Sequence, residues 1–342
     1  MSAPVRVLVV DDSAFARKVV RTSLERSPHI AVVGVARDGL EALEKIAELH
    51  PDVVTLDLIM PNLDGPGVLR ALPGEGAPRV VVVSVSEIDS ELGIEALQLG
   101  AIDLVHKPTS HATDRLYDMG DELVRVVLAA ARARPAAPFP QPGPRPQVAP
   151  ASAPGRVRLV AIGGSTGGPQ AVSRLLCALP ASLPPIAVVL HLPGEYTGSF
   201  ARRLDERSSL DVIEAEDGVP LRTGLAVIAR GGHHLRIVQG EGQAVVRLDL
   251  DPATTPHRPS VDVLFESAAE AFGGDVLGVV LTGMGEDGLR GARRIRGAGG
   301  IVLTESEASS VVYGMPRAVR EAGLADAEAP IDQMAELLLS RL

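Results

Sequence analysis

The sequence of 342 residues is poor in the residues that bind nucleic acids or form cross-links. It has one cysteine, no tryptophan, three tyrosines and five phenylalanines, and its formal net charge is −10. A single cysteine excludes an internal disulfide and a zinc site made of four cysteines, and Cys177 lies in an apolar helical pattern typical of a small core residue. Few aromatic rings and a negative charge disfavour binding to nucleic acid by stacking or by phosphate contacts.

Long apolar segments are also missing. No run approaches the ~20 uncharged apolar residues that span a bilayer. The first residues, MSAPVRVLVVDD, lead into a strand pattern without the layout of a signal peptide. We therefore expect a cytoplasmic protein with no membrane insertion. The 46% apolar and 22% charged content is sufficient for two domains with ordinary cores.

One segment divides the chain. Residues 134–155 contain eight prolines in 22 residues and almost nothing that could build a core. Proline fixes φ and disfavours helix in the residue before it, so we expect an extended, semi-rigid linker. The predicted organisation is a domain over 1–133, a Pro-rich linker over 134–155 and a second domain over 156–342.

Both halves alternate short β-branched runs with helical patterns, which predicts α/β domains with doubly wound parallel sheets. Between residues 211 and 250 turns are frequent, and we expect shorter, partly antiparallel strands there. In open parallel sheets, ligands and chemistry collect beyond the carboxyl ends of the strands, so the polar residues at those ends matter most. The clearest predicted strands are 5–10, 30–36, 53–57, 80–84 and 102–106 in the first half, and 157–162, 186–191, 276–282 and 301–304 in the second.

Five polar residues lie at the ends of the predicted strands of the first half or just after them: Asp11, Asp12, Asp57, Ser84 and Lys107. Three carboxylates at one sheet edge repel each other unless a cation lies between them, and hard oxygen ligands suit Mg²⁺. Such a site also suits phosphoryl transfer to a carboxylate, and Asp57 is the natural acceptor because it stands alone at its strand end. The alternative is that these acidic residues only begin loops and cap helices.

Residues 1–125 resemble a response-regulator receiver domain, through the acidic pair Asp11–Asp12, the segment DLIMPNLDG (57–65), Ser84 and the lysine of HKP (106–108). The resemblance implies a flavodoxin-like fold, phosphorylation at Asp57 by a histidine kinase, Mg²⁺ at the three aspartates, and switch roles for Ser84 and Lys107. One position departs from the family pattern. Leu104 stands where receivers often carry an aromatic residue, so a signal carried by movement of that ring is not available to this chain.

In the second half, the segment VAIGGSTGGPQ (160–170) poses a choice between a phosphate-binding loop and a serine turn. A P-loop needs a lysine after its glycines, and none follows. A dinucleotide fingerprint needs a different glycine spacing and an acidic residue about 20 positions on, which the chain lacks. The pattern G-x-S-x-G fits, with Ser165 between a strand and a helix, as in a serine nucleophile turn. A Gly/Ser turn without chemistry is the alternative.

A serine nucleophile needs a base and an acid. His191 ends the predicted strand 186–191, which places it beside Ser165 if the two strands are neighbours. Asp287 lies in the glycine-rich loop after strand 276–282, and it could instead only cap the following helix. Three strand ends that supply a hydroxyl, an imidazole and a carboxylate form the set used in acyl transfer. We interpret the adjacent His233 and His234 as surface or supporting residues.

Residues 157–342 resemble the catalytic domain of chemotaxis protein-glutamate methylesterases of the CheB type. The motifs that carry this resemblance are AIGGSTGGP, LHLP, SFARRLD, EAEDG, PHRPSVDVLF, LTGMGEDG and VVYGMPRAV, in the family's order. The resemblance implies a Rossmann-like catalytic domain with Ser165, His191 and Asp287 as the catalytic triad. It also implies an oxyanion hole that uses backbone N–H groups near Met284, and a positioning role for Thr166 toward the histidine.

The resemblance implies hydrolysis of glutamate γ-methyl esters and deamidation of glutamines on methyl-accepting chemotaxis receptors, with no cofactor at the esterase site. A histidine kinase of the CheA type would supply the phosphoryl group. It further implies that the unphosphorylated receiver restrains the esterase. Two other classes stay open on the residues alone. A receiver joined to a binding domain without hydrolysis is one, and a receiver coupled to DNA binding, disfavoured by the charge, is the other.

Overall fold

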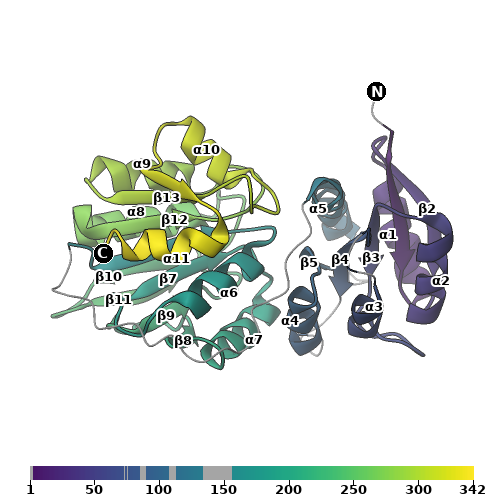
Figure 1. Cartoon of the computed structure of the whole chain (residues 1–342), viewed down its shortest axis with the longest axis horizontal. Coiled ribbons are helices and arrows are strands. Elements are labelled where there is room, and N and C mark those ends of the chain that lie inside the picture. Colours follow the sequence, from purple (N-terminus) through teal and green to yellow (C-terminus); the bar gives the residue numbers. More distant parts are fainter. Residues whose placement is uncertain (1–2, 73, 75, 85–89, 108–112, 134–155) are drawn as a thin grey trace. The chain divides into compact units, whose positions relative to one another are not determined.

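The computed structural model describes residues 3–72, 74, 76–84, 90–107, 113–133 and 156–342 (Figure 1). The chain divides into two compact units, Met1–Pro138 and Phe139–Leu342. The predicted linker, 134–155, lies outside the described residues. Among the helices that the structure describes, none has the length and apolar character needed to cross a membrane.

The first unit is a five-stranded parallel sheet in the order β2-β1-β3-β4-β5. Helices α1 and α5 pack together, and α2, α3 and α4 pack in series, so the sheet is covered on two faces (Figure 1). The doubly wound prediction is confirmed for this unit. The elements are β1 (Val5–Val10), α1 (Ala14–Glu25), β2 (Ile30–Ala36), α2 (Gly39–Leu49), β3 (Val53–Leu56), α3 (Gly65–Ala71), β4 (Arg79–Ser84), α4 (Ser90–Gln98), β5 (Asp103–His106) and α5 (Thr113–Arg132).

The second unit has a seven-stranded parallel sheet in the order β14-β13-β12-β6-β7-β9-β8, and a separate antiparallel pair, β10 and β11. Helices α8, α9 and α10 pack in series, as do α7, α6 and α11, again on two faces (Figure 1). Its strands are β6 (Leu159–Gly164), β7 (Ile186–Leu190), β8 (Asp211–Glu214), β9 (Leu225–Ile228), β10 (His234–Gln239), β11 (Ala244–Asp249), β12 (Val276–Val280), β13 (Ile301–Glu305) and β14 (Ala327–Ala329). Its helices are α6 (Gly168–Ala178), α7 (Gly194–Asp205), α8 (Val261–Phe272), α9 (Leu289–Gly297), α10 (Met315–Glu321) and α11 (Ile331–Leu339), with a 3₁₀ turn at Gly273–Asp275.

The boundaries of two strands of the second unit differ from the predictions by two residues. Strand β6 covers 159–164 instead of 157–162, so both glycines 163 and 164 pair within the sheet. Strand β12 ends at Val280, two residues before its predicted end. Within 211–250, the short strands β8 and β9 are parallel and extend the main sheet, while β10 and β11 confirm the expected antiparallel pairing.

The central strands appear as apolar runs in the sequence because nearly all of their residues are buried. All residues of β6, β7 and β12 are buried, as expected for parallel strands with helices on both faces. The order of β12, β6 and β7 is the point that matters for function. These three neighbours carry the loops that hold Asp287, Ser165 and His191.

Candidate functional site

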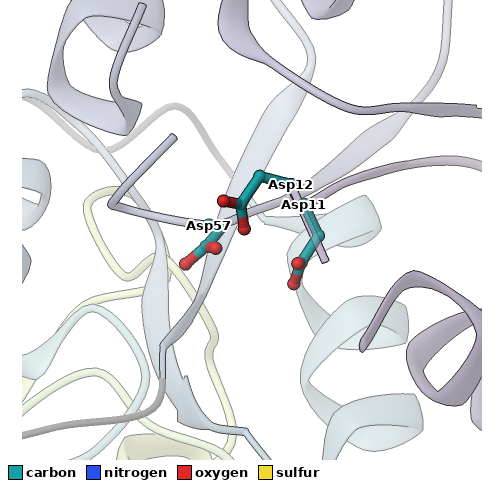
Figure 2. A group of neighbouring side chains, drawn as sticks. All are labelled: Asp11, Asp12 and Asp57. Carbon is teal, nitrogen blue, oxygen red and sulfur yellow. The ribbon is translucent and has the colours of Figure 1, made fainter. Parts of the chain in front are cut away.

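The first cluster of polar residues lies at the carboxyl ends of β1 and β3. Val10 pairs with Leu56, so Asp11 and Asp57, the residues that follow, come from adjacent strand ends. Asp11, Asp12 and Asp57 each offer a carboxylate oxygen within 4.8 Å of the others. Figure 2 shows the three side chains gathered in this way. Asp11 and Asp57 are buried and Asp12 is exposed, so the cluster is open to solvent on one side.

Lys107 bridges two of these carboxylates. Its Nζ lies 2.8 Å from Asp11 Oδ2 and 2.6 Å from Asp57 Oδ2, and the lysine is 4% exposed. Burial raises the pKa of Asp57 to about 6, against the lowering effect of the Lys107 charge. The cluster thus holds three carboxyl groups, and the Lys107 ammonium group contacts two of them. An all-oxygen set with excess negative charge and access to water is the donor set that Mg²⁺ prefers.

Ser84 ends β4 and is fully buried, and its carbonyl accepts the Lys107 N–H at 2.6 Å. This contact places Ser84 next to the backbone of the lysine. Leu104 on β5 is 5% exposed and packs in the core of the unit. The switch roles expected for Ser84 and Lys107 stay predictions.

The second cluster begins at the serine turn between β6 and α6. Gly167 has φ +75°, a left-handed conformation that glycine adopts without steric cost, and it lets the chain turn directly into the helix. The Ser165 N–H donates to Thr282 O at 3.0 Å, and Ser165 O accepts the Gly168 N–H at 2.6 Å. Ser165 is only partly buried. The turn therefore fixes the serine backbone and leaves its side chain accessible.

His191 lies next to this turn. Strands β6 and β7 are neighbours, Gly164 pairs with Leu190, and the His191 N–H donates to Gly164 O at 3.3 Å. Ser165 and His191 are the next residues on two strands that run about 4.8 Å apart. The condition that the sequence left open, adjacency of the two strands, is met.

Asp287 meets the imidazole from the third strand end. His191 Nε2 lies 2.8 Å from Asp287 Oδ2. Burial by itself would raise the pKa of Asp287, but hydrogen bonds from His191 and from two backbone N–H groups outweigh it and hold that pKa well below its usual range. The carboxylate is therefore ionised, and His191 Nε2 carries a proton.

Asp287 also caps a helix, though not the one expected. It accepts hydrogen bonds at the start of α8, from the Ser260 hydroxyl and the Val261 and Asp262 N–H groups at 2.8–2.9 Å. In return, Asp262 Oδ1 accepts the N–H groups of Gly288 and Gly291 at the start of α9, at 3.0 and 2.7 Å. Each helix supplies the cap of the other, which fixes the carboxylate that faces the histidine.

The second imidazole nitrogen is the available base. His191 Nδ1 is buried and has no hydrogen-bond partner within the described residues. With the proton on Nε2, Nδ1 carries the lone pair, which is the reverse of the arrangement in the usual Ser-His-Asp template. Among the described residues, the Ser165 hydroxyl forms no hydrogen bond, a common condition in sites without substrate.

Two residues with expected roles lie near the serine. Thr166 is buried, and its carbonyl accepts the Thr282 hydroxyl at 2.9 Å. Met284 is partly buried, and within the described residues its N–H has no acceptor, whereas the N–H of the preceding Gly283 donates to Val312 O at 3.0 Å. A free amide beside the nucleophile fits an oxyanion donor. The roles of both residues stay predictions.

Two features were missed by sequence reasoning. The ring of His257 stacks on that of His191, with centroids 4.0 Å apart and planes 17° from parallel. His234 is not a surface residue, because it is fully buried with Nε2 3.1 Å from the Thr255 hydroxyl. Nothing in the local sequence pattern marks these contacts, which join segments that are far apart in the chain.

Comparisons with known proteins agree with the resemblance noted for each half of the chain. The family model described as CheB methylesterase matches residues 160–338, and the model described as response regulator receiver domain matches residues 7–119. A Myxococcus xanthus protein named protein-glutamate methylesterase/protein-glutamine glutaminase 5 is 58% identical over 340 residues, 98% of this chain and 97% of that protein. A Geobacillus kaustophilus protein named protein-glutamate methylesterase/protein-glutamine glutaminase is 44% identical over 98% of each chain.

One solved structure covers the second unit. The CheB methylesterase catalytic domain of Thermotoga maritima is 39% identical, with a TM-score of 0.53, and the match covers 54% of this chain and 99% of that one.

Proposed function

Because the chain belongs to the CheB methylesterase family, with a response-regulator receiver domain before the catalytic region, we propose that it demethylates and deamidates chemotaxis receptors under the control of phosphorylation. Its substrates are glutamate γ-methyl esters and glutamine side chains of methyl-accepting receptors. The observation that carries the proposal is the 2.8 Å hydrogen bond from His191 to an ionised Asp287. His191 and Ser165 directly follow the paired residues Leu190 and Gly164 on neighbouring strands.

The reaction starts at the serine hydroxyl. Ser165 Oγ attacks the side-chain carbonyl carbon, and its proton passes to His191 Nδ1, the nitrogen whose lone pair is free. Asp287 stabilises the imidazolium that forms, since its carboxylate already accepts the Nε2 proton. Collapse of the tetrahedral intermediate expels methoxide, which takes the proton from Nδ1 and leaves as methanol.

In the second half of the reaction, water replaces the serine hydroxyl as the nucleophile. Water attacks the acyl-serine and gives a proton to His191 Nδ1, and the imidazole then returns a proton to Ser165 Oγ as the free glutamate leaves. With a glutamine substrate, the group expelled in the first half is ammonia. The same tetrahedral oxyanion forms, so one site serves both reactions.

We assign the oxyanion to the Met284 N–H. The N–H groups of Ser165 and Gly283 already donate to backbone carbonyls, whereas the Met284 N–H has no acceptor within the described residues. A preorganised donor of this kind contributes ~3–4 kcal/mol to the transition state. Thr166 is assigned a positioning role toward the histidine, on the basis of its burial next to the nucleophile.

In the first unit, we propose that Asp57 accepts a phosphoryl group from a histidine kinase of the CheA type. Asp11, Asp12 and Asp57 would hold Mg²⁺, whose charge would offset that of the phosphoryl oxygens. Lys107, which already contacts Asp57, would pair with the new charge, and Ser84 would respond to it. The esterase site needs no cofactor for the steps above.

We further propose that the unphosphorylated receiver restrains the esterase. Removal of residues 1–134 is then expected to raise basal methanol release. A truncated protein slower than the unphosphorylated full chain would contradict this control.

The activity is tested by methanol release from methylated receptor, with and without a phosphodonor. We expect release to increase with the phosphodonor and to disappear in Ser165→Ala. A serine-directed fluorophosphonate should label the full chain at Ser165. Release by Ser165→Ala above the uncatalysed level, or absence of labelling, would contradict the assignment.

A further inference from the structure

Thr282, just after β12, ties the serine turn to the neighbouring strand end. Its carbonyl accepts the Ser165 N–H at 3.0 Å, and its hydroxyl donates to Thr166 O at 2.9 Å. Thr282 is 1% exposed, so these bonds lie in the interior. The backbone on both sides of the nucleophile's peptide is thus positioned by one threonine.

The same threonine fixes the loop that carries the oxyanion donor. Thr282 Oγ1 accepts the Val312 N–H at 2.9 Å, and the next residue, Gly283, donates its N–H to Val312 O at 3.0 Å. A Cβ on Gly283 would lie 2.8 Å from Ser165 Cβ, which shows how closely the two loops approach. Met284 follows directly, so a shift of Thr282 moves both the nucleophile and its oxyanion donor.

The remaining polar group of Thr282, its N–H, donates to a buried carboxylate at the end of β13. Glu305 Oε2 accepts this N–H at 2.8 Å, and Oε1 accepts the Ser309 hydroxyl at 2.8 Å. Ser309 in turn accepts the Ile331 N–H at 2.8 Å, which anchors it to α11. Glu305 is 1% exposed.

Glu305 forms no ion pair within the described residues. The charged groups that face it are Arg174 on α6 and Asp332 on α11, which pair with each other at 3.2 Å. Burial accordingly raises the pKa of Glu305 to about 7, despite the hydrogen bonds from Thr282 and Ser309. A buried carboxylate without a salt bridge is costly, and its contacts here lead to the catalytic loops.

We propose that Glu305 is a positioning residue of the esterase site, whose ionised carboxylate holds Thr282 and, through it, the Ser165 turn and the Met284 loop. A hydrogen bond to a carboxylate is about twice as strong as one to a neutral acceptor, so protonation of Glu305 loosens this hold. With a pKa of about 7, Glu305 is mostly ionised at pH 8 and mostly protonated at pH 6. Activity therefore gains a dependence on pH that comes from Glu305.

This inference rests on the proposed role of Ser165, so the experiment reads the serine directly. The rate of Ser165 labelling by a fluorophosphonate is measured from pH 6 to pH 8.5 in the full chain and in Glu305→Gln, with methanol release measured in parallel. Glu270→Gln is the matched control, because Glu270 is exposed on α8 and, within the part of the chain that the structure describes, its one ion pair is with Arg294 across 3.8 Å. The melting temperature of Glu305→Gln at pH 8 should not fall below that of the full chain, since a buried charge has been removed.

We expect Glu305→Gln to label about tenfold more slowly than the full chain at pH 8, the ratio that corresponds to one weakened hydrogen bond. The ratio should approach one at pH 6, where the native carboxyl is itself protonated. Equal rates at pH 8, or a deficit of the same size at every pH, would overturn the inference. Failure of the full chain to release methanol while this labelling pattern persists would refute the proposed function alone.

Discussion

The most informative single substitution is Asp287→Asn, because Asp287 has two roles in the structure. As a carboxylate it accepts the His191 Nε2 proton, and at the same time it accepts the hydrogen bonds that cap α8. In asparagine, one of these acceptors becomes an NH₂ donor. Whichever way the amide turns, a donor then faces a donor.

The effect on the rate follows from the tautomer. If the amide nitrogen faces the imidazole, His191 must accept at Nε2 and carry its proton on Nδ1, where the base is needed. A wrong tautomer lowers kcat by ~10⁴-fold in the Ser-His-Asp template, equivalent to about 5 kcal/mol in the barrier. In either orientation an α8 N–H loses its acceptor: the Val261 N–H when the amide nitrogen replaces Oδ2, and the Asp262 N–H when it replaces Oδ1. Loss of a cap costs ~1–2 kcal/mol of stability.

The matched control is Asp262→Ala. Asp262 caps α9 with two hydrogen bonds, from Gly288 and Gly291, and among the described residues its carboxylate forms no hydrogen bond with His191. We expect it to lower the free energy of unfolding by ~1–2 kcal/mol but to leave kcat within about tenfold. Methanol release and thermal unfolding are measured for both variants. If Asp262→Ala loses as much kcat as Asp287→Asn, or if Asp287→Asn stays within tenfold of the native rate, the tautomer argument is refuted.

Three further predictions follow from packing and charge. Gly163→Ala should lower the free energy of unfolding by ~1–3 kcal/mol, because its Cβ would lie 2.2 Å from Val261 Cγ1. Gly297→Ala is the control and should not destabilise the protein, because, apart from its own helix and chain neighbours, no described residue has an atom within 4 Å of its Cβ. Equal Tm values for the two variants would contradict this prediction. His257→Ala should lower kcat by releasing the stacked ring, and His257→Phe should restore most of it; no rescue would mean that the stack is not the reason. Asp57→Asn should abolish stimulation of methanol release by a phosphodonor, and persistent stimulation would place the phosphorylation elsewhere.

The sheets and the strand ends were predictable from the sequence, because parallel strands that are buried on both faces appear as continuous apolar runs. The polar residues that follow these runs, such as Asp57 and Ser165, stood out for the same reason. The succession of apolar runs did not predict the order of the strands in the sheet. The neighbour relation of β6, β7 and β12, on which the triad depends, became certain only with the pairing of the strands.

Contacts between distant segments could not be predicted. The stack of His257 on His191 and the bond from Glu305 to Thr282 depend on tertiary packing, and no local spacing marks them. The cap formed by Asp287 was anticipated in kind but assigned to the wrong helix. The residue lies before α9, and its side chain turns back to α8, which only the three-dimensional arrangement decides.

The central claim is that Ser165, His191 and Asp287 act as one catalytic unit, and a double-mutant comparison of kcat tests it most directly. Methanol release from methylated receptor is measured for Ser165→Ala, His191→Ala and the double variant. Because each single change disables the same proton transfer and attack, we expect the double variant to be no slower than the slower single variant. Losses that multiply in the double variant would show two independent contributions and would contradict the account.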